Sequence, residues 1–178
     1  MVVALTVAVA VLAALLFVLL GAQIELFEQV KQMRRFLDLE DRVTVLELGA
    51  AKGARPSGFG LPVDIDEADH ALVLLLSNKC ASCQTIAATM RGGHLPPSTW
   101  LVVVPVTGDG SDFVEAYQLQ NAPRVLVDRD ERITGGLGID VTPAGLLVED
   151  GRLVSAQTVP SVRHLRAVQP TGKKAAHA

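Results

Sequence analysis

Short apolar runs alternate with segments of helical spacing along the chain from about residue 61 onward. The runs Asp69–Leu76 and Trp100–Val106 are dominated by aliphatic residues, which is typical of buried strands in a parallel sheet. Helices are expected at 84–90, at 112–119 with Ser111 as the N-cap, at 131–137 and at 161–168. Strands that alternate with helices predict an α/β fold with a parallel core.

Two further runs near the C-terminus predict a β-hairpin. Residues 144–148 and 153–156 flank Glu149-Asp150-Gly151-Arg152, and an Asp-Gly pair between apolar runs is typical of a tight hairpin turn. A shorter run at 124–127 predicts another strand. The hairpin adds antiparallel strands, so the central sheet is expected to be mixed.

The N-terminal residues have a different pattern. No residue from Val2 to Ala22 is charged, and about 20 apolar residues is the length that a bilayer core requires of a helix. We interpret residues 1–22 as a transmembrane anchor. A cleaved signal peptide fits less well, because no basic residue precedes the run and Leu20-Gly21-Ala22 is a poor cleavage site.

Residues 23–45 are predicted to continue as an amphipathic juxtamembrane helix. Its apolar stripe has three candidate partners, namely the domain that follows, the lipid surface, or another chain in a homo- or hetero-oligomer. The Gly- and Pro-rich segment 46–60 predicts a linker. The expected domain organisation then continues with a folded domain at 61–168 and a flexible polar tail at 169–178.

Charge excludes one class of partner and leaves the orientation in the membrane open. The net charge of -3 and the pI near 5.8 give no electrostatic reason to expect nucleic acid. Lys31, Arg34 and Arg35 follow the apolar run, so the positive-inside rule alone would place the bulk of the chain in the cytoplasm.

The two cysteines of the chain, Cys80 and Cys83, lie two residues apart where the first predicted strand ends and a helix is expected to begin. A cysteine in the first turn of a helix is close to exposed backbone N–H groups, which favour the thiolate. The second cysteine can then close an intramolecular disulfide. Two cysteines are too few for a disulfide scaffold, and no second Cys-x-x-Cys is present for zinc. A redox pair is the favoured interpretation, with half of a metal site or an incidental pair as alternatives.

Cys80-Ala81-Ser82-Cys83 after a buried strand resembles the active-site motif of the thioredoxin superfamily, and Val141-Thr142-Pro143 at the start of the hairpin resembles its cis-proline loop. The resemblance covers about residues 61–168. It implies a thioredoxin-like fold, a mixed central sheet flanked by helices. It also implies a Thr142-Pro143 loop that faces the dithiol, docks the substrate chain and keeps metal away from the sulfurs.

Within the superfamily, the arrangement is similar to the membrane-anchored TlpA and ResA proteins and to the MauD accessory proteins. That resemblance implies a thiol-disulfide oxidoreductase that acts on protein thiols and disulfides, with no cofactor beyond a redox-active Cys80–Cys83 disulfide. It implies a single-pass protein of the cell membrane, whose soluble domain is extracytoplasmic as in bacteria. One possible role is the maturation of a specific extracytoplasmic protein.

The sequence departs from the family pattern in three ways. Lys79 stands where tryptophan is common, no proline lies between the cysteines, and neither the strand before them nor the helix after them supplies a carboxylate to accept the proton of Cys83. The ammonium group of Lys79 would favour the Cys80 thiolate. Met90 and His94 keep a soft-metal site open. The alternative function is therefore a non-catalytic metal-binding or assembly module of the same fold.

Overall fold

The computed structural model describes residues 16–17 and 42–168. Contacts divide the chain into residues 1–41 and 42–178, and the fold below is that of the second unit. The predicted anchor, most of the predicted juxtamembrane helix and the predicted tail lie outside the described residues. No helix within the described ranges is long and apolar enough to cross a membrane.

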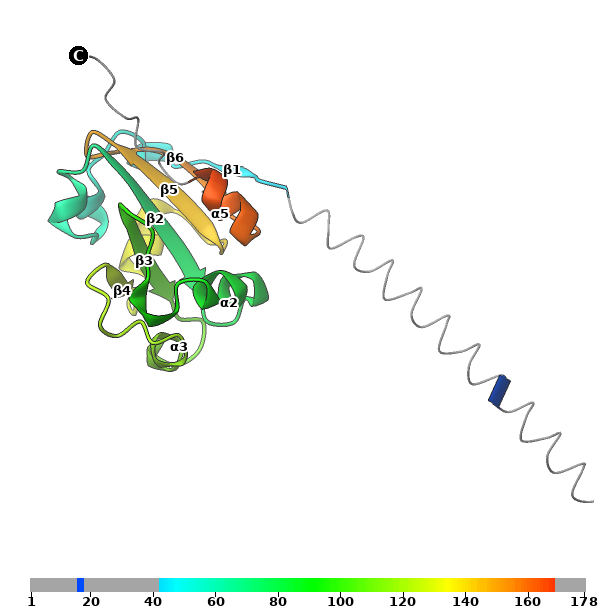
Figure 1. Cartoon of the computed structure of the whole chain (residues 1–178). Helices are drawn as coiled ribbons and strands as arrows, with labels where there is room; N and C mark the ends of the chain where they lie inside the picture. The colour runs from blue at the N-terminus through cyan, green and yellow to red at the C-terminus, as the bar shows by residue number, and fades with distance from the viewer. Residues whose placement is uncertain (1–15, 18–41, 169–178) are drawn as a thin grey trace, which may run out of the picture. The chain divides into compact units, whose positions relative to one another are not determined.

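The described part of the chain contains a six-stranded mixed sheet (Figure 1). Its strands are β1 Val45–Leu46, β2 His70–Ser77, β3 Thr99–Val104, β4 Val125–Val127, β5 Ala144–Glu149 and β6 Arg152–Thr158. The spatial order is β1-β6-β5-β2-β3-β4. β2, β3 and β4 are parallel, whereas β5 pairs antiparallel with β2, β6 with β5, and β1 with β6. This mixed sheet is the one that a thioredoxin-like fold implies.

Four helices flank the sheet in this part of the chain: α2 Ala81–Ala88, α3 Ser111–Ala116, α4 Arg132–Leu137 and α5 Val162–Val168. Short 3-10 turns lie at Gly49–Ala51, Pro56–Phe59, Val63–Ile65 and Arg91–Gly93. The prediction that Ser111 is the N-cap of the helix now labelled α3 was wrong. Ser111 is the first residue of α3. The backbone N–H and the hydroxyl of Ser111 donate hydrogen bonds to the Asp109 carboxylate, at 3.0 Å and 2.6 Å.

β2 is the centre of the hydrophobic core. Residues 71–76 are fully buried, and alternate side chains of the strand contribute to two clusters on opposite faces of the sheet. Helices α2, α3 and α5 cover one face, where Ile86, Phe113 and Leu165 are buried. The second face is covered by α4 and by the 3-10 turns that precede β2, through residues such as Ile133 and Ile65. Burial on both faces explains why β2 is an unbroken apolar run.

The segment 46–60 differs from the linker that its composition predicted. β1 pairs with β6, with Val45 opposite Gln157. Further along, the backbone N–H of Gly53 donates to the Leu153 carbonyl at 2.7 Å. Leu48 and Ala51 are buried in the core. Glycine and proline prevent long regular elements here, but 3-10 turns still bring two isolated apolar side chains onto the sheet.

The predicted hairpin is confirmed. Asp150 and Gly151 join β5 to β6 with φ values of 48° and 68°, the left-handed pair of a type I′ turn. A Cβ at Gly151 would overlap the Asp66 carbonyl oxygen, so this position requires glycine for space as well as for its φ.

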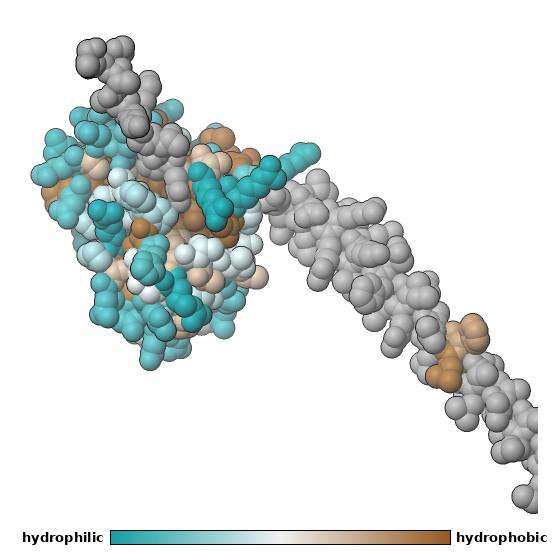
Figure 2. All heavy atoms as spheres, in the orientation of Figure 1, coloured by the Kyte–Doolittle hydropathy of each residue, from teal (hydrophilic) through white to brown (hydrophobic). Residues whose placement is uncertain are grey.

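On the face seen in Figure 2, hydrophilic residues cover most of the coloured surface of this unit, with smaller apolar areas between them.

Candidate active site

The cysteine pair lies where β2 passes into α2. β2 ends at Ser77, and Cys80 is the N-cap of α2, with φ -91° and ψ 124°. The Cys80 sulfur accepts a hydrogen bond from the backbone N–H of Cys83 at 3.2 Å. Both cysteines are free thiols. The sulfur of Cys80 therefore satisfies one of the N–H groups that a helix leaves unpaired in its first turn.

The two thiols have different environments. Cys80 is half-buried, whereas Cys83 has no exposed surface and belongs to the core cluster beneath α2. Burial raises the pKa of Cys83 to about 12, and a hydrogen bond with Cys80 adds to this rise. Interactions with the Ser77 backbone and the Thr142 side chain partly oppose it. Cys83 is thus a protonated thiol at neutral pH, behind a more accessible Cys80.

The Thr142-Pro143 loop lies beside the dithiol. The register of β5 against β2 pairs Ala144 with Leu75. This places the two preceding residues, Thr142 and Pro143, at the end of β2 where the cysteine loop, residues 78–80, begins. The Thr142–Pro143 peptide bond is cis, as the resemblance implies. The thiol of Cys80 contacts the Thr142 carbonyl oxygen at 3.7 Å. The fold thus brings together residues that are 62 positions apart.

The loop before Cys80 is held by Asn78. Its side-chain amide donates to the Thr107 carbonyl at 2.7 Å and accepts from the Val106 backbone N–H at 2.9 Å. Lys79, the next residue, is exposed. Its effect on the Cys80 thiolate stays a prediction. The anchoring role of Asn78 was missed, because its partners lie beyond the end of β3 and have no signature in the sequence.

A cleft of about 550 Å³ lies on the α4 side of the sheet. Ser77 and Thr142 line it, and Thr142 is the residue that contacts Cys80. Glu131 and Asp140 line it from the two ends of α4. α4 is fixed by Asp128, which is 4% exposed. The Asp128 carboxylate accepts the backbone N–H groups of Ile133 (3.0 Å) and Thr134 (2.9 Å) and the Thr134 hydroxyl (2.9 Å).

The acidic residues of this region were also missed in the sequence. Asp128 follows β4 directly, and a polar residue at the C-terminal end of a parallel strand is the signal that was available. Glu131 and Asp140 lie in loops at the two ends of α4, and only the folded chain brings them to the same cleft as the cysteine loop.

Met90 and His94 were named for a soft-metal site. Met90 is 1% exposed and belongs to the same buried cluster as Cys83. Within the described ranges, no three His, Cys, Asp or Glu side chains are grouped as metal ligands would be. Trp100 is a packing residue, as expected, with the Arg124 guanidinium 5.0 Å from its ring centroid.

No protein-family model and no curated protein matches the chain. Among solved structures, a secreted disulfide oxidoreductase of Mycobacterium tuberculosis, described as homologous to E. coli DsbE, is 20% identical, with 58% of this chain and 80% of that chain covered and a TM-score of 0.40. StoA from Bacillus subtilis is 16% identical, with 57% and 82% covered and a TM-score of 0.41. A putative thioredoxin from Neisseria meningitidis is 13% identical, with 78% and 98% covered and a TM-score of 0.44.

The different environments of the two thiols predict selective alkylation. We expect iodoacetamide to modify Cys80 of the reduced, folded protein at pH 8 and to leave Cys83 unmodified, because Cys83 is buried and stays protonated until the pH approaches 12. Mass spectrometry of the digested protein measures both sites. In denaturant both cysteines should react alike. Equal modification of the two in the folded protein would contradict the asymmetry.

Proposed function

We propose that this protein catalyses thiol-disulfide exchange with protein substrates through Cys80 and Cys83. The observation that supports this most directly is the asymmetric dithiol, in which an accessible Cys80 caps a helix and a fully buried Cys83 lies one turn behind it. The more accessible sulfur suits attack on a partner. The protected sulfur suits a second step inside the protein.

In the reducing direction, the Cys80 thiolate attacks one sulfur of a substrate disulfide. A Cys80–substrate disulfide forms, and the other substrate sulfur leaves as a thiolate and takes up a proton. Cys83 then loses its proton and attacks the Cys80 sulfur, which forms the Cys80–Cys83 disulfide and releases the first substrate sulfur as a thiol. The same steps in reverse oxidise a substrate dithiol, and the potential of the pair sets the direction.

In this proposal, the Thr142-Pro143 loop docks the substrate chain. Its support is the contact of 3.7 Å between the Cys80 sulfur and the Thr142 carbonyl oxygen, which brings loop backbone to the reacting atom. Pro143 is buried, and its carbonyl oxygen accepts the Val159 backbone N–H at 2.9 Å. The loop is therefore held in place before a substrate arrives. Lys79, exposed next to Cys80, would favour its thiolate.

Replacement of Cys83 tests the exchange. We expect Cys83→Ala in the full chain to accumulate a mixed disulfide with a substrate protein in cells, because the second step is blocked. Non-reducing electrophoresis should show a larger species that disappears when dithiothreitol reduces the mixed disulfide. Cys80→Ala is the matched control and should trap nothing. A Cys83→Ala protein without a trapped partner, or one that retains metal on purification, would contradict the exchange function and favour the metal-binding alternative.

We also propose that the protein is anchored in the cell membrane through residues 1–22, with residues 61–168 outside the cytoplasm. The support is the length of the uncharged run and the resemblance to TlpA, ResA and MauD proteins. Maturation of a specific extracytoplasmic protein belongs to the same proposal. Lys31, Arg34 and Arg35 count against this orientation under the positive-inside rule.

The orientation can be measured with a membrane-impermeant maleimide on intact bacteria that express the full chain. An extracytoplasmic domain predicts that reduced Cys80 is labelled before permeabilisation, because it is the more exposed cysteine. Cys80→Ala supplies the background. Labelling that occurs only after the cells are permeabilised would place the domain in the cytoplasm.

A further inference from the structure

The cleft beside the dithiol has a one-sided charge. Among the described residues that line it, Glu131 and Asp140 are acidic and none is basic. Both carboxylates belong to exposed residues. In the described part of the chain, the one ion pair joins Arg129 to Asp109 at 3.7 Å. Neither Glu131 nor Asp140 takes part in an ion pair within the described part of the chain.

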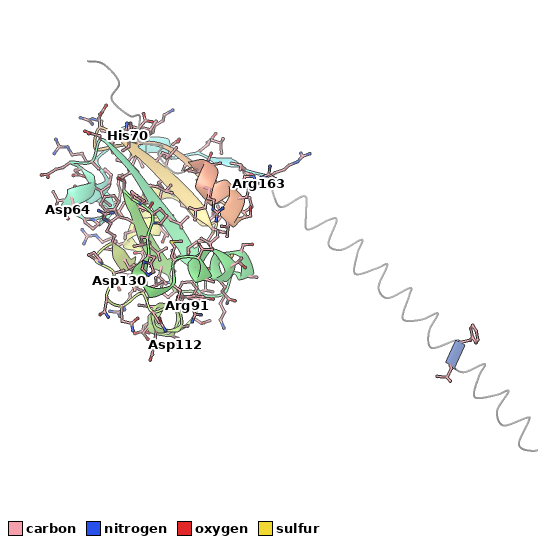
Figure 3. The ribbon with its side chains drawn as sticks, viewed as in Figure 1. Asp64, His70, Arg91, Asp112, Asp130 and Arg163 are labelled. Atoms are coloured by element: carbon pink, nitrogen blue, oxygen red, sulfur yellow. The ribbon has the colours of Figure 1, made fainter. Side chains whose placement is uncertain are left out.

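The basic side chains next to the cleft in sequence are directed elsewhere. Arg129 is paired with Asp109. The Arg132 side chain lies against Gly60, because the Cδ atom of Arg132 is 3.4 Å from the position that a Cβ atom would occupy on Gly60. Arg124 lies over the ring of Trp100. Figure 3 labels Asp130, the residue before Glu131, toward the end of the sheet where α2 begins. Lys79, two residues after Ser77, is exposed and lines a separate hollow with Asn78 and Gln84.

A serine that is almost fully buried also lines this cleft. Ser77 is 4% exposed and lines the cleft, and its hydroxyl has no hydrogen-bond partner among the described residues. Side chains alternate along β2, so Ser77 lies on the same face as Val73 and Leu75, the face that α4 covers. Its hydroxyl is a polar group available to a ligand in the acidic cleft.

We propose that this cleft binds a lysine or arginine side chain of the substrate polypeptide, close in sequence to the reactive cysteine. The inference rests on the proposed exchange function and adds the class of substrate. An ammonium or guanidinium group would lie between Glu131 and Asp140, and the Ser77 hydroxyl would accept one of its hydrogens.

The position of the basic residue follows from Thr142. This residue lines the cleft, and its carbonyl oxygen is 3.7 Å from the sulfur that forms the mixed disulfide. Three residues of an extended chain span about 10 Å, so we expect the basic side chain within about three positions of the substrate cysteine.

Model peptides test the inference on the full chain in a neutral detergent. Capped Gly-Ser peptides carry one central cysteine as a 2-pyridyl disulfide, with Lys, Gln or Glu two residues to either side. The Cys80 thiolate attacks the peptide sulfur and pyridine-2-thione leaves; Cys83 then releases the peptide thiol. The release of pyridine-2-thione gives the rate. Division by the rate with free dithiothreitol removes the intrinsic reactivity of each peptide.

We expect the Lys peptide to react about fivefold faster than the Glu peptide at low ionic strength, with Gln between them. The preference should fall to less than about twofold in 0.5 M salt. The same loss is expected at low salt in the double variant Glu131→Gln, Asp140→Asn, which keeps the size of both side chains.

A second double variant, Glu67→Gln, Glu149→Gln, is the matched control. It removes two exposed carboxylates near the other end of β2, where Glu149 is opposite His70, labelled in Figure 3. This variant should keep the full Lys preference, because its change in net charge is the same and the cleft is intact.

Each outcome has one meaning. Equal rates for the Lys and Glu peptides, or an equal loss of preference in both double variants, would overturn the charge inference while exchange itself stands. Failure of every peptide to react would contradict the exchange function and this inference together. A Lys preference lost only in the Glu131→Gln, Asp140→Asn variant would support the cleft as the binding site.

Discussion

The structure depends on the burial of β2 on both faces and on its pairing along both edges. Its apolar run is enclosed by α2, α3 and α5 on one face and by α4 and the 3-10 turns on the other. β3 and β5 fix its two edges. Because β2 is packed on both faces and paired along both edges, the chain leaves the sheet only at the end of this strand, where the cysteine loop begins. The core thus determines where the sulfurs lie.

The same strand brings the partners of the dithiol to it. Antiparallel pairing with β5 places Thr142 and Pro143 beside the cysteine loop, and parallel pairing through β3 to β4 places Asp128 and α4 at the same end of the sheet. Cys83 is protected on the core-facing side of α2, while the N-cap position leaves Cys80 more accessible. The chemical asymmetry of the two cysteines follows from one strand-to-helix junction.

The elements that depend on local pattern could be predicted from the sequence. Apolar runs indicated β2, β3 and the hairpin, and Asp150-Gly151 indicated its turn. Features that depend on distant contacts could not. Leu48 and Ala51 are two isolated apolar residues in a Gly-rich segment, and only the folded sheet shows what they pack against. The cleft likewise combines Ser77 with Glu131 and Asp140, which are more than 50 positions away in the chain.

The central claim is that Cys80 and Cys83 form a reversible redox pair, and a redox titration tests it most directly. The purified full chain is equilibrated in dithiothreitol or glutathione buffers, and trapped thiols are counted by mass spectrometry. We expect one two-electron transition at a potential between roughly -270 and -120 mV, with Cys80–Cys83 as the sole disulfide, and no such transition in Cys83→Ala. A pair that stays reduced throughout this range, or forms only disulfides between chains, would contradict it.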